Sequence, residues 1–179
     1  HGGLECLDRR RDPRTESLEL EAFLGAERTT APSVDGPLVV WNQRWEHDKD
    51  PLGWLRIMTR LADAGVSFRL ALAGERPRER DRDASRLLDR LADRIELDTF
   101  LDRDAYRDLL VCSDVFLSCA RHEFFGISVV EAIAAGCVPV LPDALSHPEL
   151  IPDRWHDAVL YQPGRAQEAL AEVLADIDA

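Results

Sequence analysis

Two carboxylates flank a glycine turn in the segment His122–Ala132, which reads HEFFGISVVEA. Glu123 precedes Gly126 by three residues, and Glu131 follows it by five. Short apolar runs lie on both sides of the segment, so we predict that Gly126 opens a helix between two strands of a sheet. The first amides of such a helix lack acceptors and carry the positive end of the helix dipole. These amides could hold a diphosphate while the two acids bind the hydroxyls of a sugar.

Glu131 has a simpler alternative role. Ser128 and Glu131 stand at the spacing of a capping box, in which the glutamate only bonds back to the start of its own helix. His122 could be a base or a ligand, but a single histidine beside a site is also compatible with packing or ordinary hydrogen bonding. Since no second histidine or acid stands at ligand spacing, we predict no metal site.

A second candidate segment follows the apolar run Leu38–Val40. It contains Arg44 and Lys49, which is the only lysine of the chain. A planar guanidinium and a compact ammonium are natural phosphate partners. Because acids are interspersed with these bases, a solvated charged loop is the alternative. A third segment, Leu141–Glu149, could close over a ligand or merely turn the chain.

The elements that position these segments alternate between strand and helix. The predicted strands cover residues 38–42, 67–73, 95–100, 115–118, 138–141 and 159–161. The predicted helices cover residues 16–24, 51–64, 83–93, 103–112, 128–135 and 165–177, and 147–151 form a helical turn. This alternation predicts an α/β, Rossmann-like, doubly wound parallel sheet, with its site at the carboxyl ends of the strands. Pro139 is unfavourable in a central strand, but the surrounding pattern favours one.

Composition narrows the class of protein. With 179 residues, the chain can bury a normal core in one domain, and its net charge of −12 argues against a basic nucleic-acid surface. No run is long and apolar enough to span a membrane. The four cysteines stand at no metal spacing, and buried thiols in a reducing compartment are expected. We therefore expect a cytoplasmic location.

Together the segments resemble the C-terminal, donor-binding domain of GT-B glycosyltransferases of the family 4 type. Arg44 and Lys49 match its phosphate-binding pair, and Glu123 and Glu131 match its Glu-x7-Glu motif. The segments WNQRWEHDK, HEFFGISVVEA and LSHPEL are also similar to those of the tRNA-queuosine α-mannosyltransferase family and its bacterial relatives. Many family 4 enzymes have Gly-Gly where this chain has Leu145-Ser146-His147. This difference favours the tRNA-queuosine α-mannosyltransferase family over an ordinary family 4 enzyme.

The resemblance implies a retaining, metal-independent transfer of mannose from GDP-mannose, with queuosine in tRNA as the acceptor. No other cofactor is implied. Arg44 and Lys49 would stabilise the leaving diphosphate, and Glu123 would hold sugar hydroxyls. Glu131 would bind the ribose. The amides of Gly126, Ile127 and Ser128 would bind the phosphates. The backbone near Phe100 and Leu101 would contact the base.

On this resemblance, residues 1–37 are a lead-in from a missing N-terminal domain, and residues 38–179 form the nucleotide-sugar-binding domain. GT-B enzymes close two domains around the reacting groups, so this chain alone is expected to bind donor without turnover. Its acidity disfavours tRNA binding unless the other domain supplies a basic surface. Two alternatives remain: a family 4 enzyme that makes glycans or glycolipids from a UDP- or GDP-sugar, and a non-catalytic nucleotide-binding module.

Overall fold

The computed structural model describes residues 35–76 and 81–178, so the lead-in up to residue 34 and the helix expected near Glu16–Leu24 lie outside it. The described residues contain a six-stranded sheet with the strand order β3-β2-β1-β4-β5-β6, and every neighbouring pair is parallel. This arrangement confirms the predicted Rossmann-like fold. The strands are β1 (Leu38–Trp41), β2 (Arg69–Leu72), β3 (Ile95–Asp98), β4 (Val115–Leu117), β5 (Val138–Pro142) and β6 (Leu160–Tyr161).

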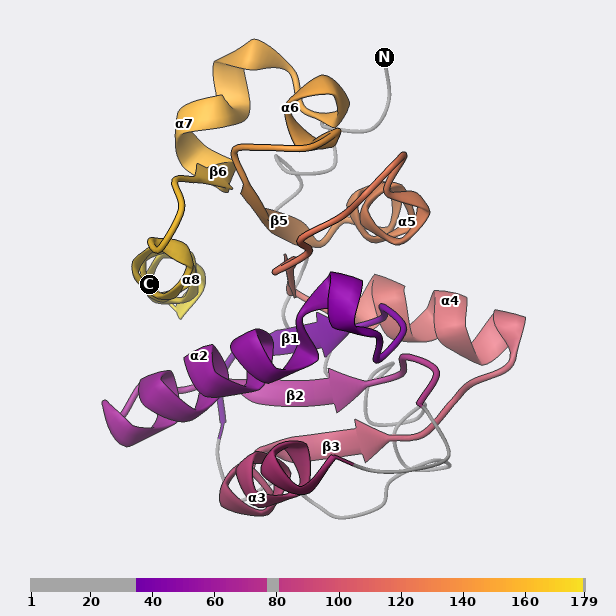
Figure 1. Ribbon diagram of the computed structural model, residues 1–179, viewed down its shortest axis with the longest axis vertical. Coiled ribbons are helices and arrows are strands. Elements are labelled where there is room, and N and C mark those ends of the chain that lie inside the picture. Colours follow the sequence, from indigo (N-terminus) through magenta and orange to yellow (C-terminus); the bar gives the residue numbers. More distant parts are fainter. Residues whose placement is uncertain (1–34, 77–80, 179) are drawn as a thin grey trace.

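Helices connect successive strands and cover the sheet (Figure 1). The longer ones are α2 (Pro51–Asp63), α3 (Arg82–Arg90), α4 (Arg103–Cys112), α5 (Ile127–Ala135) and α8 (Ala166–Asp178). The short ones are the 3-10 turns η2 (His47–Lys49) and η3 (Asp153–Trp155) and the single-turn helices α6 (His147–Leu150) and α7 (His156–Val159). In the part of the chain that the structure describes, no helix is long and apolar enough to cross a membrane.

The boundaries of some elements differ from the sequence prediction. The strand expected over residues 67–73 is confined to Arg69–Leu72, and Val159, expected in the last strand, ends α7 instead. The turns η2 and η3 and the helix α7 were not predicted. Elements of three or four residues are too short to show a full period of side-chain alternation, so the sequence pattern carries little signal for them.

β1 is apolar on both faces, because each face packs on a different layer of helices. Val39 and Trp41 belong to one core cluster, which includes side chains of α2, α3 and α8. Leu38 and Val40 belong to the other, which includes side chains of α4 and α5. Successive side chains of a strand point to opposite faces. The continuous apolar run of this strand therefore follows from its central position in a parallel sheet.

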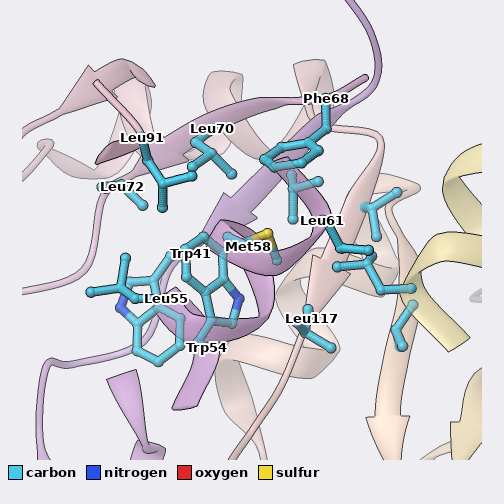
Figure 2. Packing of buried hydrophobic residues seen from close by; sticks show 14 of the residues in the cluster. Trp41, Trp54, Leu55, Met58, Leu61, Phe68, Leu70, Leu72, Leu91 and Leu117 are labelled. Atoms are coloured by element: carbon cyan, nitrogen blue, oxygen red, sulfur yellow. The ribbon is translucent and has the colours of Figure 1, made fainter. Parts of the chain in front are cut away.

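Two tryptophans anchor the first of these cores. Trp41 on β1 meets Trp54 on α2 edge to face, with ring centroids 5.3 Å apart and an interplanar angle of 67°. Figure 2 shows both rings beside Leu55 and Met58 of the same helix. Asp50 is the N-cap residue of α2, and its Oδ1 accepts a hydrogen bond from the amide of Gly53 at 3.1 Å. This packing sets the distance between β1 and the helix that follows it.

Pro139 lies in β5 without disrupting the sheet. The amide of Val138 donates to the Asp114 carbonyl, and the Val140 carbonyl accepts from Ser118, so these two residues bond towards β4. Alternate residues bond to opposite sides of a strand, which directs the nitrogen of Pro139 towards β6. Pairing with β6 begins only at Leu141. The missing N–H therefore falls where no partner strand needs it.

Strand order reverses between β1 and β4. From β1 the chain continues to β2 and β3 on one side, and β4, β5 and β6 extend the sheet on the other. At such a reversal the connecting helices leave towards opposite faces, and a crevice opens at the carboxyl ends of the two strands. The segments after β1 and after β4, which carry the predicted site residues, therefore meet at this crevice.

Gly74 is closely packed against the segment that follows β1. A Cβ added to it would lie 1.8 Å from the carbonyl oxygen of Gln43 and 2.8 Å from Nε1 of Trp41. These contacts are with backbone and with a buried ring, which cannot easily move. Only glycine fits here, and its absence of a side chain allows the end of β2 to approach the loop that carries Arg44.

We expect Gly74→Ala to lower the free energy of unfolding by about 3 kcal/mol, because the backbone must shift to admit the methyl group. Urea denaturation would measure the change. Gly65→Ala is the matched control, since Gly65 has a φ of +77° but nothing within 4 Å of its added Cβ. Left-handed strain alone costs about 1–2 kcal/mol, so equal losses in the two variants would contradict the close packing at Gly74.

Candidate functional site

A cleft of about 1170 Å³ opens at the carboxyl ends of β1 and β4. Its walls come from the segments after β1 and β2, from α4 and the loop before it, and from α5 and the loop before it. All nine residues that the sequence predicted for the site line this cleft: Arg44, Lys49, Phe100, Leu101, Glu123, Gly126, Ile127, Ser128 and Glu131. The structure therefore brings residues from three distant segments to one place, at the reversal in strand order.

The loop after β1 is held against the loop after β4. The amides of Arg121 and His122 both approach the carbonyl of Asp48, at 2.7 Å and 3.3 Å. Arg121 also pairs with the carboxylate of Asp50 at 3.1 Å. Asp48, which accepts from these amides, belongs to the turn η2. The turn therefore directs Lys49 towards the loop after β4. His122, which could have been a base or a ligand, has an exposed side chain and contributes its backbone carbonyl.

Lys49 and Glu123 form the central ion pair of the cleft. The ammonium Nζ lies 2.9 Å from Oε2 of Glu123, and the two side chains are only 12% and 11% exposed. Nζ also donates to the carbonyl of His122 at 3.0 Å, while Oε1 of Glu123 accepts from the amide of Gly126 at 3.0 Å. Glu123 thus connects the cation of one loop to the first turn of α5. Little freedom remains in either side chain.

Arg44 has a different setting. Its side chain is 58% exposed and lies 3.1 Å from the carboxylate of Glu46. The prediction treated Arg44 and Lys49 as one phosphate-binding pair. In the structure both line the cleft, but Lys49 is held in a buried contact whereas Arg44 can reorient in solvent. An exposed ion pair is weak, so an incoming anion can displace Glu46 from Arg44 at little cost.

The N-terminus of α5 faces the cleft. Gly126 is the N-cap residue, with a φ of 82°, and as a glycine it has no side chain to accept from the next amides of the helix. The amide of Gly126 already donates to Glu123, so the amides of Ile127 and Ser128 are the ones open to an anion. Gly126 also lies close to Leu150 of α6, because a Cβ added to it would be 3.1 Å from a methyl group of that leucine.

The capping-box interpretation of Glu131 is wrong. α5 begins at Ile127, so Ser128 lies inside the helix and is not its N-cap residue. Glu131 instead accepts a hydrogen bond at Oε2 from the hydroxyl of Tyr106, at 2.8 Å. Burial of the phenol, together with the carboxylate of Glu131, raises the pKa of Tyr106 well above its ordinary value, so the hydroxyl remains a donor.

Tyr106 and Asn42 are among the cleft residues that were not predicted from the sequence. Asn42 stands directly after β1 and donates to the hydroxyl of Tyr106 at 2.9 Å and to the carbonyl of Ser128 at 3.1 Å. The position of Asn42 at the carboxyl end of a central strand was a usable signal. Tyr106 gave none, because a single tyrosine within a helix is also typical of a packing residue.

The loop between β3 and α4 lines the cleft with Phe100, Leu101 and Asp102. The ring of Phe100 is 71% exposed, whereas Leu101 beside it is buried in the core of the second face. Asp102 caps α4 by accepting from the amides of Asp104 and Ala105. An exposed aromatic ring beside a capped helix offers a flat surface on which a planar ligand can stack.

The segment Leu141–Glu149, which was expected to close over a ligand or to turn the chain, contributes no residue to the lining of the cleft within the described structure. It turns the chain into α6. His147 is fully buried there, and burial lowers its pKa, although the nearby carboxylate of Glu123 partly opposes the shift. Among the described residues, no group of three or more histidine, cysteine or acidic side chains is placed to hold a metal ion.

Comparison with known proteins adds independent information. The family described as "Glycosyl transferases group 1" matches residues 27–177. A tRNA-queuosine alpha-mannosyltransferase of Drosophila melanogaster is 32% identical over 125 residues, which cover 69% of this chain and 33% of that protein. A 2-deoxystreptamine glucosyltransferase of Streptomyces kanamyceticus is 33% identical over 129 residues, covering 70% and 33% of the two chains.

A GDP-mannose:cellobiosyl-diphosphopolyprenol alpha-mannosyltransferase of Xanthomonas oryzae pv. oryzae (strain PXO99A) is 28% identical over 131 residues, which are 70% of this chain and 33% of that one. The chain thus spans about a third of the length of these relatives. Among solved structures, the catalytic domain of cholesterol-alpha-glucosyltransferase from Helicobacter pylori has a TM-score of 0.64 at 18% identity, covering 80% and 89% of the chains. That likeness concerns the fold, which matches GT-B structures.

The largely buried ion pair between Lys49 and Glu123 leads to a first prediction for this site. We expect a double-mutant cycle of Lys49→Met and Glu123→Gln to give a coupling of about 1–3 kcal/mol in the free energy of unfolding. Lys49→Met removes the cation that pairs with Glu123, and Glu123→Gln leaves Lys49 the longer ion pair with Asp48, at 3.4 Å. Chemical denaturation would measure the four proteins.

Arg90 and Asp63 provide the control cycle, since they form an ion pair whose side chains are 55% and 60% exposed. Their coupling should stay below about 0.5 kcal/mol. If the two couplings are equal, the Lys49–Glu123 contact does not hold the two loops together.

His147 leads to a second prediction, about pH. Because the folded-state pKa of His147 is lowered, the unfolded chain takes up a proton that the folded chain resists as pH falls below about 6.5. Stability is therefore present above that pH and is lost below it, by up to about 1.4 kcal/mol per pH unit. Between pH 7 and pH 5, the unfolding free energy of His147→Leu should decline less steeply than that of the wild type. Parallel curves would exclude this histidine as the cause.

Proposed function

Because this chain belongs to the glycosyl transferases group 1 family, we propose that it is the nucleotide-sugar-binding domain of a retaining glycosyltransferase. The donor is GDP-mannose and the acceptor is queuosine in tRNA. One observation carries the proposal: Lys49, Glu123 and the open amides of α5 converge at the reversal in strand order. A cation, a carboxylate and a helix N-terminus are the groups that a sugar diphosphate requires.

The diphosphate binds where positive charge is concentrated. The amides of Ile127 and Ser128 and the ammonium of Lys49 take the phosphate oxygens, and Arg44 joins them by exchanging Glu46 for the ligand. As the bond between the sugar and the diphosphate breaks, negative charge grows on the leaving group. Lys49 and Arg44 stabilise that charge without needing to lose or gain a proton.

The sugar and the nucleoside lie on either side of the phosphates. Glu123 accepts hydrogen bonds from sugar hydroxyls, and its anchoring by Lys49 and Gly126 keeps the carboxylate in position. Glu131 binds the ribose from the second turn of α5. The base lies at the end of the cleft formed by Phe100 and Leu101, where the exposed ring can stack on it.

Mannose and the tRNA acceptor are supported by similarity to named relatives. Two of the relatives are named as mannosyltransferases, and one of these acts on tRNA-queuosine. Since GT-B enzymes close two domains around the reacting groups, we expect a further domain to supply most contacts to the acceptor. We also expect the net charge of −12 to keep this domain away from the RNA phosphates.

A second candidate has its own support. The Streptomyces relative, 33% identical, is named as a glucosyltransferase acting on 2-deoxystreptamine. If this chain follows that relative, it uses a UDP- or GDP-sugar to build a glycan or another small glycoside. Binding of UDP rather than GDP in the cleft would distinguish a UDP-dependent enzyme from the GDP-mannose-dependent enzyme proposed first.

Thermal unfolding with candidate ligands tests the proposal. GDP-mannose and GDP should each raise the unfolding midpoint of this chain by about 5–10 °C at a hundred times their dissociation constants, since such occupancy adds about 2.7 kcal/mol. UDP, UDP-glucose and NAD should leave it unchanged. Lys49→Ala and Glu131→Ala should abolish the shift, because each removes a ligand-binding group.

Arg90→Ala is the control, since Arg90 pairs with Asp63 away from the cleft and should retain the shift. A shift with the UDP ligands alone would establish the second candidate instead. No shift with any ligand would show that this domain does not bind a donor by itself and would overturn the proposed role.

A further inference from the structure

Three side chains form a continuous hydrogen-bonded chain along the inner wall of the cleft. The amide of Asn42 donates to the hydroxyl of Tyr106 at 2.9 Å, and that hydroxyl donates to Oε2 of Glu131 at 2.8 Å. The three residues come from the end of β1, from α4 and from α5. They lie 64 and 25 residues apart in sequence. The contact therefore exists only in the folded domain.

The bonding capacity of each group defines what Tyr106 can do. Its hydroxyl gives its one proton to Glu131 and accepts from Asn42. Asn42 in turn directs its other amide proton to the carbonyl of Ser128 in the first turn of α5. Tyr106 therefore has no proton left to donate to a ligand. The group that its proton holds in place is the carboxylate of Glu131.

The consequence for Glu131 is a fixed orientation. Its side chain is exposed, and an exposed glutamate normally samples many rotamers. The hydrogen bond at Oε2 fixes one oxygen, whereas no described residue holds Oε1 in a hydrogen bond. Since Tyr106 and Glu131 both line the cleft, Oε1 remains available to a ligand that binds there. Burial of the phenol and the adjacent carboxylate raise the pKa of Tyr106, which keeps the donated proton in place.

We infer that Tyr106, supported by Asn42, is a positioning residue that orients Glu131 to accept the ribose hydroxyls of the nucleotide. This inference rests on the proposed function, in which Glu131 binds the ribose. It goes beyond that function because Tyr106 would strengthen binding of the ribose without contacting the ribose itself. Loss of the phenolic hydroxyl leaves the carboxylate present but free to rotate.

Tyr106→Phe tests the inference, because it keeps the ring and removes only the hydroxyl. Calorimetric titration would compare GDP and UDP with their 2′,3′-dideoxy forms, which lack the ribose hydroxyls. We expect Tyr106→Phe to weaken binding of the ordinary nucleotide by roughly tenfold and that of the dideoxy form by less than about twofold. In a Glu131→Gln background, the further effect of Tyr106→Phe should also be small, because the oriented carboxylate is already lost.

Tyr161→Phe is the matched control. Tyr161 is the other tyrosine of the chain, and its hydroxyl donates to the carbonyl of Ser118 at 2.8 Å. This variant should lower the unfolding midpoint without changing nucleotide affinity. Equal weakening of ordinary and dideoxy nucleotides by Tyr106→Phe would mean a merely structural role and would overturn the inference alone. If the wild-type chain binds neither GDP nor UDP, the proposed function fails, and the inference falls with it.

Discussion

The ion pair between Lys49 and Glu123 joins two loops that would otherwise diverge. One loop leaves β1 and the other leaves β4, at the position where neighbouring connections of a doubly wound sheet turn towards opposite faces. The glutamate also accepts from the amide of Gly126, so the start of α5 depends on the same contact. The reversal in strand order creates a crevice between β1 and β4, and this ion pair then sets the shape of the cleft by joining the two loops there.

The principal elements and the general position of the site could be predicted from the sequence. β1 is a short run that is apolar on both faces, and α2 has a capping aspartate, a proline in its first turn and a glycine past its end. Such signals are local, so they can be identified in the sequence without knowing which elements pack together. The carboxyl ends of parallel strands share one edge of the sheet, and this rule was sufficient to place Arg44, Lys49, Glu123 and Glu131 around one cleft.

The contacts inside the cleft could not be predicted in the same way. The spacing of Ser128 and Glu131 matches a capping box, but the N-cap residue is Gly126, in a left-handed conformation, so Ser128 lies inside the helix and cannot cap it. The hydroxyl of Tyr106 then reaches Glu131 from another helix. Likewise, the mixed charges around Lys49 are compatible with a solvated loop, but its side chain is nearly buried because η2 packs on the loop after β4. In each case a contact between distant segments overrides a plausible local pattern.

The position of β1 at the centre of the sheet also constrains how the domain can fold. β1 can pair with β2 after a connection of about thirty residues, whereas its other partner, β4, follows much later, and the amide of Leu38 meets the carboxylate of Asp114 across 76 residues. Closing a longer loop costs more entropy and slows pairing. The cleft lies between the two strands that are joined over this longer distance. An intermediate in which only β1, β2 and β3 have assembled therefore has no binding site, and a ligand can stabilise the domain only after the last long-range pairing is complete.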